Sequence, residues 1–146
     1  MLDIKLYSKE LFKQVIEVTD DTVEQSSDYF ICVNSTGHIH GIPYFNQPHI
    51  NVLNCTFDDT DHDHTKFDNI FNVEFSAKAC TPEQAETIVK FIDTIPDGSV
   101  VHIYCAKGKS RSPAIAKFIS ERRNNTDMET PSYNTHVYEL LKNVRL

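Results

Sequence analysis

One strand–loop–helix pattern constrains the fold of this chain more than any other feature. The apolar, largely β-branched run 99–104 leads into a short loop that contains Gly108, and an alanine-rich apolar stretch then continues to Arg123. Apolar β-branched runs are typical of buried strands, and a serine followed by proline is typical of a helix start. The pattern therefore predicts a central strand, a tight loop, and a helix with Ser112 as its N-cap and Pro113 in its first turn.

The same alternation of strand and helix patterns continues through the rest of the 146 residues. Short strands are expected over 2–6, 29–33 and 49–57. Helices are expected after Ser8, after Thr81 with Gln84 closing a capping box, and from about Asn134. This order predicts an α/β fold in one domain, residues 1–146, with a central, mostly parallel sheet flanked by helices. Ligands of such folds bind beyond the carboxyl ends of the strands.

Composition and charge limit the classes of partner. Lys and Arg total 14 against 21 Asp and Glu, a formal charge of -7, which disfavours nucleic acid and anionic membranes. The sequence has no apolar run long enough for a membrane span, and early charged residues exclude a signal-peptide core. The 4 cysteines form no CxxC pair and indicate free thiols in a reducing compartment. We therefore expect a cytoplasmic protein with no membrane partner.

The loop between the predicted strand and helix contains the residues that are able to react with or bind a ligand. Cys105 and Arg111 are separated by five residues at the helix N-terminus. Backbone N–H groups converge at such a junction and stabilise both a bound dianion and a thiolate. Gly108 provides backbone conformations that other residues avoid, and a guanidinium binds two phosphate oxygens at once. The loop therefore predicts a nucleophilic thiol beside a phosphate site.

Two other interpretations of this loop are weaker. The triplet Gly108-Lys109-Ser110 is found in nucleotide-binding loops, but those loops need a glycine where this chain has Ile103. An isolated cysteine at a strand end is often a buried structural residue. The combination of Cys105, Gly108 and Arg111 in one strand–loop–helix favours the reactive interpretation.

The run Cys-x-x-Gly-x-x-Arg-Ser that starts at Cys105, followed by Pro113 and an alanine-rich helix, resembles the signature of the cysteine-dependent protein tyrosine phosphatases. The compact length resembles their dual-specificity branch, and the similarity extends more loosely over residues 29–119. The resemblance implies hydrolysis of phosphotyrosine, and in that branch of phosphoserine and phosphothreonine, through a phosphocysteine intermediate. A phosphorylated protein or peptide would be the partner, and no cofactor is needed.

The resemblance also implies a role for each residue of the loop. Cys105 would be the nucleophile, Arg111 the clamp on the phosphate, and Ser112 the hydroxyl that assists departure of the thiolate. Substrate phosphate would be bound mainly by the backbone amides of Ala106, Lys107, Gly108, Lys109, Ser110 and Arg111.

The chain departs from the family immediately before the cysteine. The family usually has a histidine there, whereas this chain has Tyr104, with the nearest histidine two positions earlier. Strand alternation places His102 and Tyr104 on one face. We interpret His102 as a hydrogen-bonded structural residue and expect Cys105 to be less acidic than is usual in the family.

The general acid is expected in the acidic segment that follows the predicted strand 49–57, as in the resembled family. Asp59 is the first choice and Asp58 the second, because a position at the strand end is more rigidly aimed. Asp61 and Asp63 stay open if the loop folds over the site, and a purely solvated acidic loop is the remaining alternative.

Other side chains of this region suggest sites that we do not favour. Metal ligands are available in Asp61, His62, Asp63 and His64, with His38 and His40 nearby, but they lack a fixed ligand spacing, so we predict no metal. Exposed lysines at 107 and 109 offer a basic rim for highly charged substrates or are simply solvated. Aromatic residues at 29, 44 and 45 are interpreted as core rather than pocket.

Two other functions stay open at this stage. The missing histidine and the unassigned acid allow a phosphate-binding or adaptor module that turns over poorly. The phosphatase substrate is alternatively a phosphoinositide or an RNA 5′ end, although the acidic charge argues against RNA. Turnover separates the binding module from the enzyme.

Overall fold

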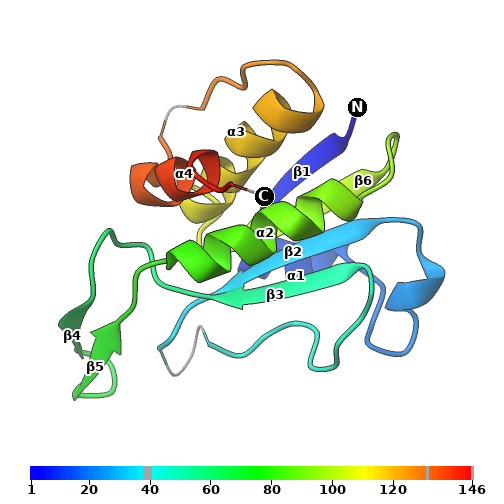
Figure 1. Ribbon diagram of the computed structural model, residues 1–146. Coiled ribbons are helices and arrows are strands. Elements are labelled where there is room, and N and C mark those ends of the chain that lie inside the picture. The colour runs from blue at the N-terminus through cyan, green and yellow to red at the C-terminus, as the bar shows by residue number, and fades with distance from the viewer. Residues whose placement is uncertain (38–40, 131, 146) are drawn as a thin grey trace.

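The computed structural model describes residues 1–37, 41–130 and 132–145. A four-stranded parallel sheet has the order β1-β6-β2-β3, formed by β1 (Asp3–Ser8), β2 (Tyr29–Asn34), β3 (Val52–Thr56) and β6 (Val100–Cys105). The helices are α1 (Lys9–Val15), α2 (Pro82–Thr94), α3 (Arg111–Arg123) and α4 (Thr135–Lys142), with a short 3-10 turn η1 (Val23–Gln25). The prediction of an α/β fold with a parallel sheet flanked by helices is confirmed (Figure 1).

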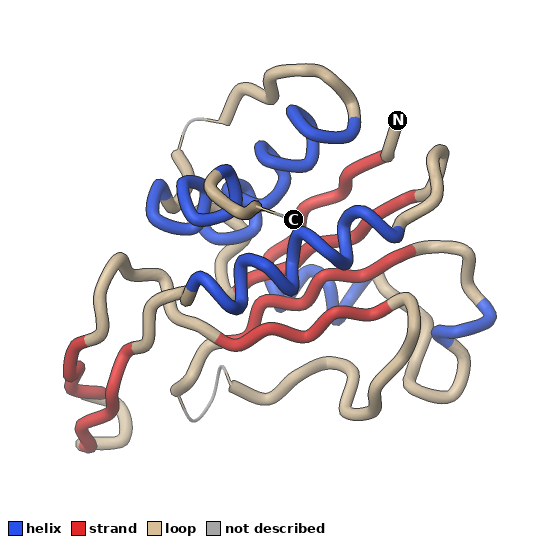
Figure 2. The backbone as a smooth tube through the Cα atoms, viewed as in Figure 1, coloured by secondary structure: helices blue, strands red, loops and turns tan. Residues whose placement is uncertain are grey.

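Helices cover the sheet unequally. Figure 2 shows α2, α3 and α4 over one face and α1 behind the other. Successive side chains of the interior strand β6 alternate between these faces. Ile103 and Cys105 belong to the larger core under α2, α3 and α4, whereas Tyr104 belongs to the aromatic core with Phe12 of α1. The sheet thus presents Cys105 and Tyr104 to opposite layers.

Several expected helix starts are confirmed by their caps. Thr81 Oγ1 accepts from the Gln84 N–H, and the Gln84 side chain accepts from the Thr81 N–H, which completes the capping box. Asn134 caps α4 by accepting from the Val137 N–H. None of the helices in the described part of the chain is long and apolar enough to cross a membrane.

The start of α3 corrects the expectation that Ser112 is the N-cap. The helix begins at Arg111, and Ser110 occupies the cap position without a side-chain cap. Ser112 lies in the first turn, where its N–H and hydroxyl contact the sulfur of Cys105 instead of capping the helix. The helix therefore directs one of its first free amides, the N–H of Ser112, at the thiol.

Two further expectations change in the middle of the chain. The strand predicted over 49–57 is limited to Val52–Thr56; His49 precedes it, forms an isolated antiparallel bridge with Val52, and binds Asp20 and Glu24 through its side chain. The acidic segment that follows is not one loop: β4 (His64–Asp68) and β5 (Val73–Ala77) form an antiparallel hairpin. Figure 1 shows this hairpin projecting beside the main sheet.

Candidate active site

The loop from β6 to α3 is packed directly against the end of β1. Gly108 has φ +69, and a Cβ there would lie 2.7 Å from Ser8 N and 2.8 Å from the carbonyl of Tyr7. Both the backbone angle and the contact therefore require glycine. Lys9 N donates to the carbonyl of Ala106 at 3.4 Å, a second tie to the same junction. These contacts fix the path of the loop around Cys105.

Cys105 lies at the end of β6 with its sulfur surrounded by donors. Its Sγ is 3.2 Å from Ser112 Oγ and 3.5 Å from Ser112 N. Burial raises the pKa of Cys105, but hydrogen bonds from Ser112, the charge of Arg111 and the Gly108 N–H outweigh it, so the pKa is below its ordinary value. By contrast, burial raises the pKa of the other three thiols, which are Cys32, Cys55 and Cys80, the last to about 12.

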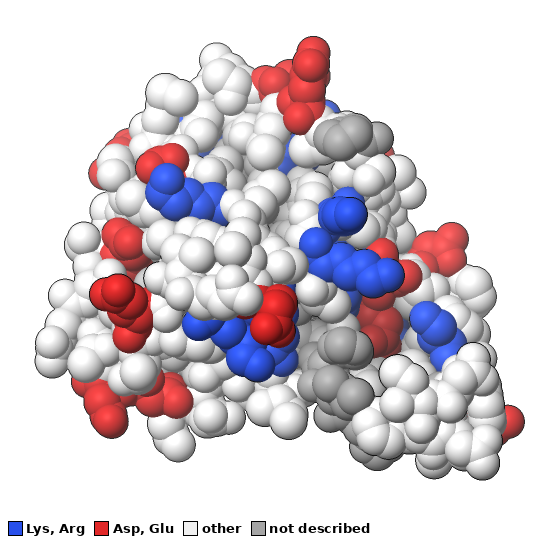
Figure 3. All heavy atoms as spheres, turned by 180° about the vertical axis from the view of Figure 1, so that it is seen from behind, with Lys and Arg blue, Asp and Glu red and all other residues white. Residues whose placement is uncertain are grey.

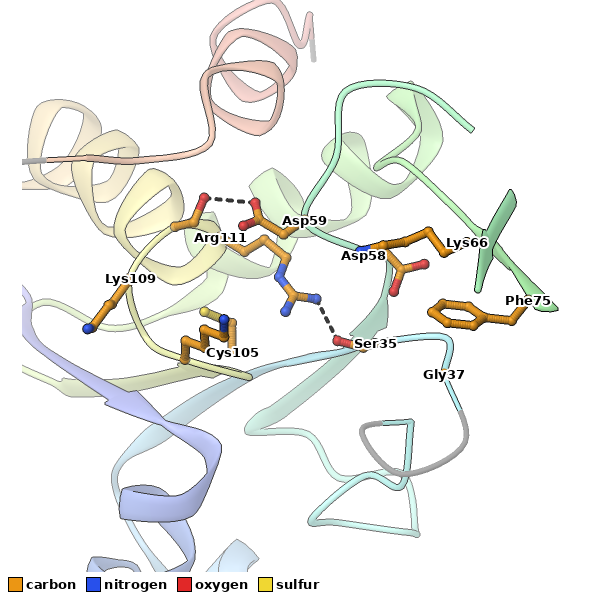
Figure 4. Close-up of a pocket in the computed structure, with 11 residues that line it drawn as sticks. Ser35, Gly37, Asp58, Asp59, Lys66, Phe75, Cys105, Lys109 and Arg111 are labelled. Carbon is orange, nitrogen blue, oxygen red and sulfur yellow. Dashed lines mark hydrogen bonds between the residues drawn. The ribbon is translucent and has the colours of Figure 1, made fainter. Parts of the chain in front are cut away.

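Arg111 is buried beside this thiol, with 5% of its surface exposed. Nη1 donates to Ser35 Oγ at 2.9 Å and to the Phe57 carbonyl at 2.7 Å, which anchors one side of the guanidinium. The buried Nε has no hydrogen-bond partner among the described residues. A buried donor without a partner is costly, and a bound anion would satisfy it. Figure 4 shows the guanidinium between Cys105 and Ser35.

Asp59 reaches the same site from the loop after β3. Its Oδ1 accepts from Ser110 Oγ at 2.7 Å and from Asn134 Nδ2 at 2.8 Å. Its other oxygen, Oδ2, has no hydrogen bond to any residue that the structure describes. The loop thus holds an exposed carboxyl group in the lining of the same pocket as Cys105 and Arg111 (Figure 4).

Asp58 is a poor candidate for the acid although it is adjacent in sequence. Its Oδ1 accepts from Thr36 N at 3.0 Å, and its Oδ2 accepts from Lys78 N at 2.8 Å and from the Thr36 hydroxyl. Burial raises the pKa of Asp58, but the hydrogen bonds from Thr36 and Lys78 and the charge of Arg111 bring it below its ordinary value. Asp58 is therefore a structural residue that stays ionised and links its own loop to the segments that contain Thr36 and Lys78.

The other acids of this segment lie outside the pocket lining. Asp61 pairs with His62 at 2.6 Å, and Asp63 accepts from Ala79 N at 2.9 Å. No group of three or more His, Cys, Asp or Glu side chains that could hold a metal occurs within the described residues. His38 and His40, which we considered with the acidic segment, lie outside the described residues.

The pocket around these groups has a volume of about 330 Å³. Lys107, Lys109 and Ser110 of the loop line it, and so do Lys66 and Phe75 from β4 and β5. Sequence reasoning missed these two, although a signal was present. Apolar and polar residues alternate over Val73–Ala77, directly after Asn72, which takes a positive φ of 54, and this pattern is typical of a strand that follows a turn.

The residues before Cys105 have structural roles. His102 lies 2.8 Å from Asp28 through Nε2 and 2.7 Å from the Tyr7 hydroxyl through Nδ1, which confirms its interpretation as a satisfied structural histidine. Tyr104 donates to Asn34 Oδ1 at 2.6 Å from the face opposite to the thiol. The predicted core role of Phe45 and Tyr44 is also confirmed, and Tyr29 packs on Phe91.

Surface charge is unevenly distributed despite the net charge of -7. On the side opposite to that of Figure 1, Lys and Arg side chains lie over the middle and acidic side chains lie mainly around them (Figure 3).

No family model, curated protein or solved structure matches this chain. The interpretation of the site therefore rests on its own geometry.

Proposed function

We propose that this protein is a cysteine-dependent phosphatase that hydrolyses phosphotyrosine, and also phosphoserine and phosphothreonine, in phosphorylated proteins or peptides. The observation that carries the proposal is the buried, unpartnered Nε of Arg111 beside a thiol whose pKa is lowered. An anion-binding donor and an activated nucleophile are the two groups that phosphoryl transfer to cysteine requires. All four cysteines are free thiols, which fits a reducing compartment such as the cytoplasm.

In the proposed first step, the backbone amides of the loop and Arg111 bind the phosphate. The Cys105 thiolate attacks phosphorus, an S–P bond forms, and the P–O bond to the leaving group breaks. Asp59 protonates the leaving oxygen through Oδ2, so that the alcohol or phenol departs neutral. Arg111 neutralises charge on the transferring group in both steps.

In the second step, a water molecule attacks phosphorus through its oxygen, and the Asp59 carboxylate accepts a proton from that water. The S–P bond breaks, inorganic phosphate leaves, and the thiolate returns. Ser112 Oγ, 3.2 Å from the sulfur, is placed to donate a hydrogen bond to the departing thiolate. Neither step requires a metal ion.

Turnover of p-nitrophenyl phosphate in the presence of chelator tests the proposal. Chelator-resistant hydrolysis that depends on Cys105 supports a thiol phosphatase, whereas phosphate binding without turnover indicates a binding module. A panel of phosphotyrosine, phosphoserine and phosphothreonine peptides then defines the specificity. A phosphoinositide and an RNA 5′-triphosphate in the same panel test the nonprotein alternatives.

Replacing Asp59 by asparagine is expected to lower kcat/KM for phenyl phosphate by about 10²- to 10⁴-fold, because a phenolate leaves poorly without a proton donor. The loss should be far smaller for dinitrophenyl phosphate, because its leaving group needs little protonation. Asp61→Asn is the matched control, since Asp61 does not line the pocket. Equal losses on both substrates would count against Asp59 as the acid.

Replacing Phe75 by alanine is expected to raise KM for aryl phosphates roughly two- to tenfold, the loss of one ring contact. Phe75 lines the pocket from β5, on the side away from the phosphate loop (Figure 4). Phe67→Ala on the same hairpin is the control, because Phe67 is not part of the lining. Steady-state kinetics with aryl and alkyl phosphates measure the effect, and an equal change for both classes would contradict ring packing.

A further inference from the structure

Asn134 joins three parts of the site. Its Oδ1 accepts from Val137 N at 3.0 Å and caps α4, while its Nδ2 donates to Asp59 Oδ1 at 2.8 Å. Its backbone N–H donates to the carbonyl of Ser110 at 3.0 Å. The residue is buried, with 9% of its surface exposed. One residue therefore links a helix start and the acidic loop through its side chain and the phosphate loop through its backbone.

The contacts at Asp59 determine which of its oxygens is available for proton transfer. Ser110 Oγ and Asn134 Nδ2 both donate to Oδ1, at 2.7 and 2.8 Å. An oxygen that accepts two hydrogen bonds in this way is a poor place for a further proton. The proton of the neutral acid therefore resides on Oδ2, which has no partner in the described part of the chain.

Helix capping alone does not explain an amide at this position. Serine and aspartate cap helices about as well as asparagine does, and threonine is also a common cap. Of these, only asparagine combines the acceptor that caps the helix with an N–H donor for a neighbouring carboxylate. Besides capping the helix, the side chain thus donates a hydrogen bond to Asp59.

We propose that Asn134 is a positioning residue for proton transfer, which orients Asp59 so that Oδ2 faces the leaving oxygen. This inference rests on the proposed phosphatase function. Asn134 does not contact the reacting atoms and acts through Asp59. Because it also bonds to Ser110, it keeps the acid in register with the loop that binds the phosphate.

Asn134→Ser tests this role because serine retains an acceptor for the cap but lacks the amide N–H, and its hydroxyl lies one bond short of the position of Nδ2. We expect kcat/KM for phenyl phosphate to fall about tenfold, the rate equivalent of one hydrogen bond to a charged group, with little change for dinitrophenyl phosphate. In an Asp59→Asn background the same substitution should cause no further loss, because its effect passes through Asp59. Tyr138→Phe is the control: it removes a hydrogen bond from α4 to Glu121, and both rates should stay unchanged.

The outcomes distinguish this inference from the proposed function. Equal losses on both substrates, or a loss that adds fully to that of Asp59→Asn, would overturn the role of Asn134 and leave the phosphatase intact. Absence of Cys105-dependent turnover in the unchanged protein would overturn both. If circular dichroism shows that Asn134→Ser is unfolded, Asn134→Thr also keeps a cap acceptor and lacks the amide N–H, adds no charge beside Asp59, and should show the same dependence on leaving group.

Discussion

Replacing Cys105 by serine is expected to lower phosphate-monoester hydrolysis by at least about four orders of magnitude. The donors around Sγ stabilise a thiolate, and a serine hydroxyl does not ionise in the same pH range. Hydrolysis of p-nitrophenyl phosphate with chelator measures the loss. Cys80→Ala, which removes another buried thiol, should retain activity; equal losses in the two variants would indicate a general effect of cysteine removal.

The same thiol should be identifiable by its pH dependence. The pKa of Cys105 lies below its ordinary value, so the reactive thiolate persists as the pH falls, whereas burial raises the pKa of Cys32 and Cys55. Iodoacetamide near neutral pH should therefore label the Cys105 peptide first, and the rate should decline only below the ordinary range for thiols. Labelling that begins at another cysteine would contradict this assignment.

Replacing Arg111 by lysine is expected to lower kcat/KM by about 10³-fold, although the charge is kept. The guanidinium uses Nη1 to hold Ser35 and the Phe57 carbonyl and keeps Nε for the anion. The single ammonium group of lysine does not both bind Ser35 and the Phe57 carbonyl and donate to the anion. Inhibition by inorganic phosphate should weaken in parallel with the loss of turnover.

Arg122→Lys provides the matched control for this substitution. Arg122 pairs with Asp93 on the surface, away from the pocket, and both phosphate inhibition and turnover should be nearly unchanged. Retention of phosphate affinity and turnover in Arg111→Lys would show that the bidentate fork is not required.

The local parts of this structure were predictable from the sequence. The capping box at Thr81 and Gln84, the cap at Asn134 and the β6–loop–α3 unit depend on neighbouring residues, and each is present. The alternation of β6 also placed His102 on the face away from Cys105. Signals that span only a few residues suffice for such features.

The parts that depend on distant contacts were not predictable. Ser112 precedes a proline as N-cap residues often do, but its N–H and hydroxyl contact the sulfur of Cys105, and the helix starts at Arg111. The sequence made Asp59 the first choice and Asp58 the second, but only the structure shows that the amides of Thr36 and Lys78 bind the carboxylate of Asp58. The contact between Asn134 and Asp59 spans 75 positions, beyond any local pattern.

Trapping of the phosphoenzyme tests the central claim most directly. Asp59→Asn should slow the second step, so that rapid mixing with dinitrophenyl phosphate, a detergent quench and peptide mapping would reveal the accumulated intermediate. We expect one phosphoryl group on the peptide that contains Cys105, and none when Cys105 is also replaced by serine. Hydrolysis that proceeds without any labelled cysteine, or with the phosphoryl group on another residue, would contradict the account.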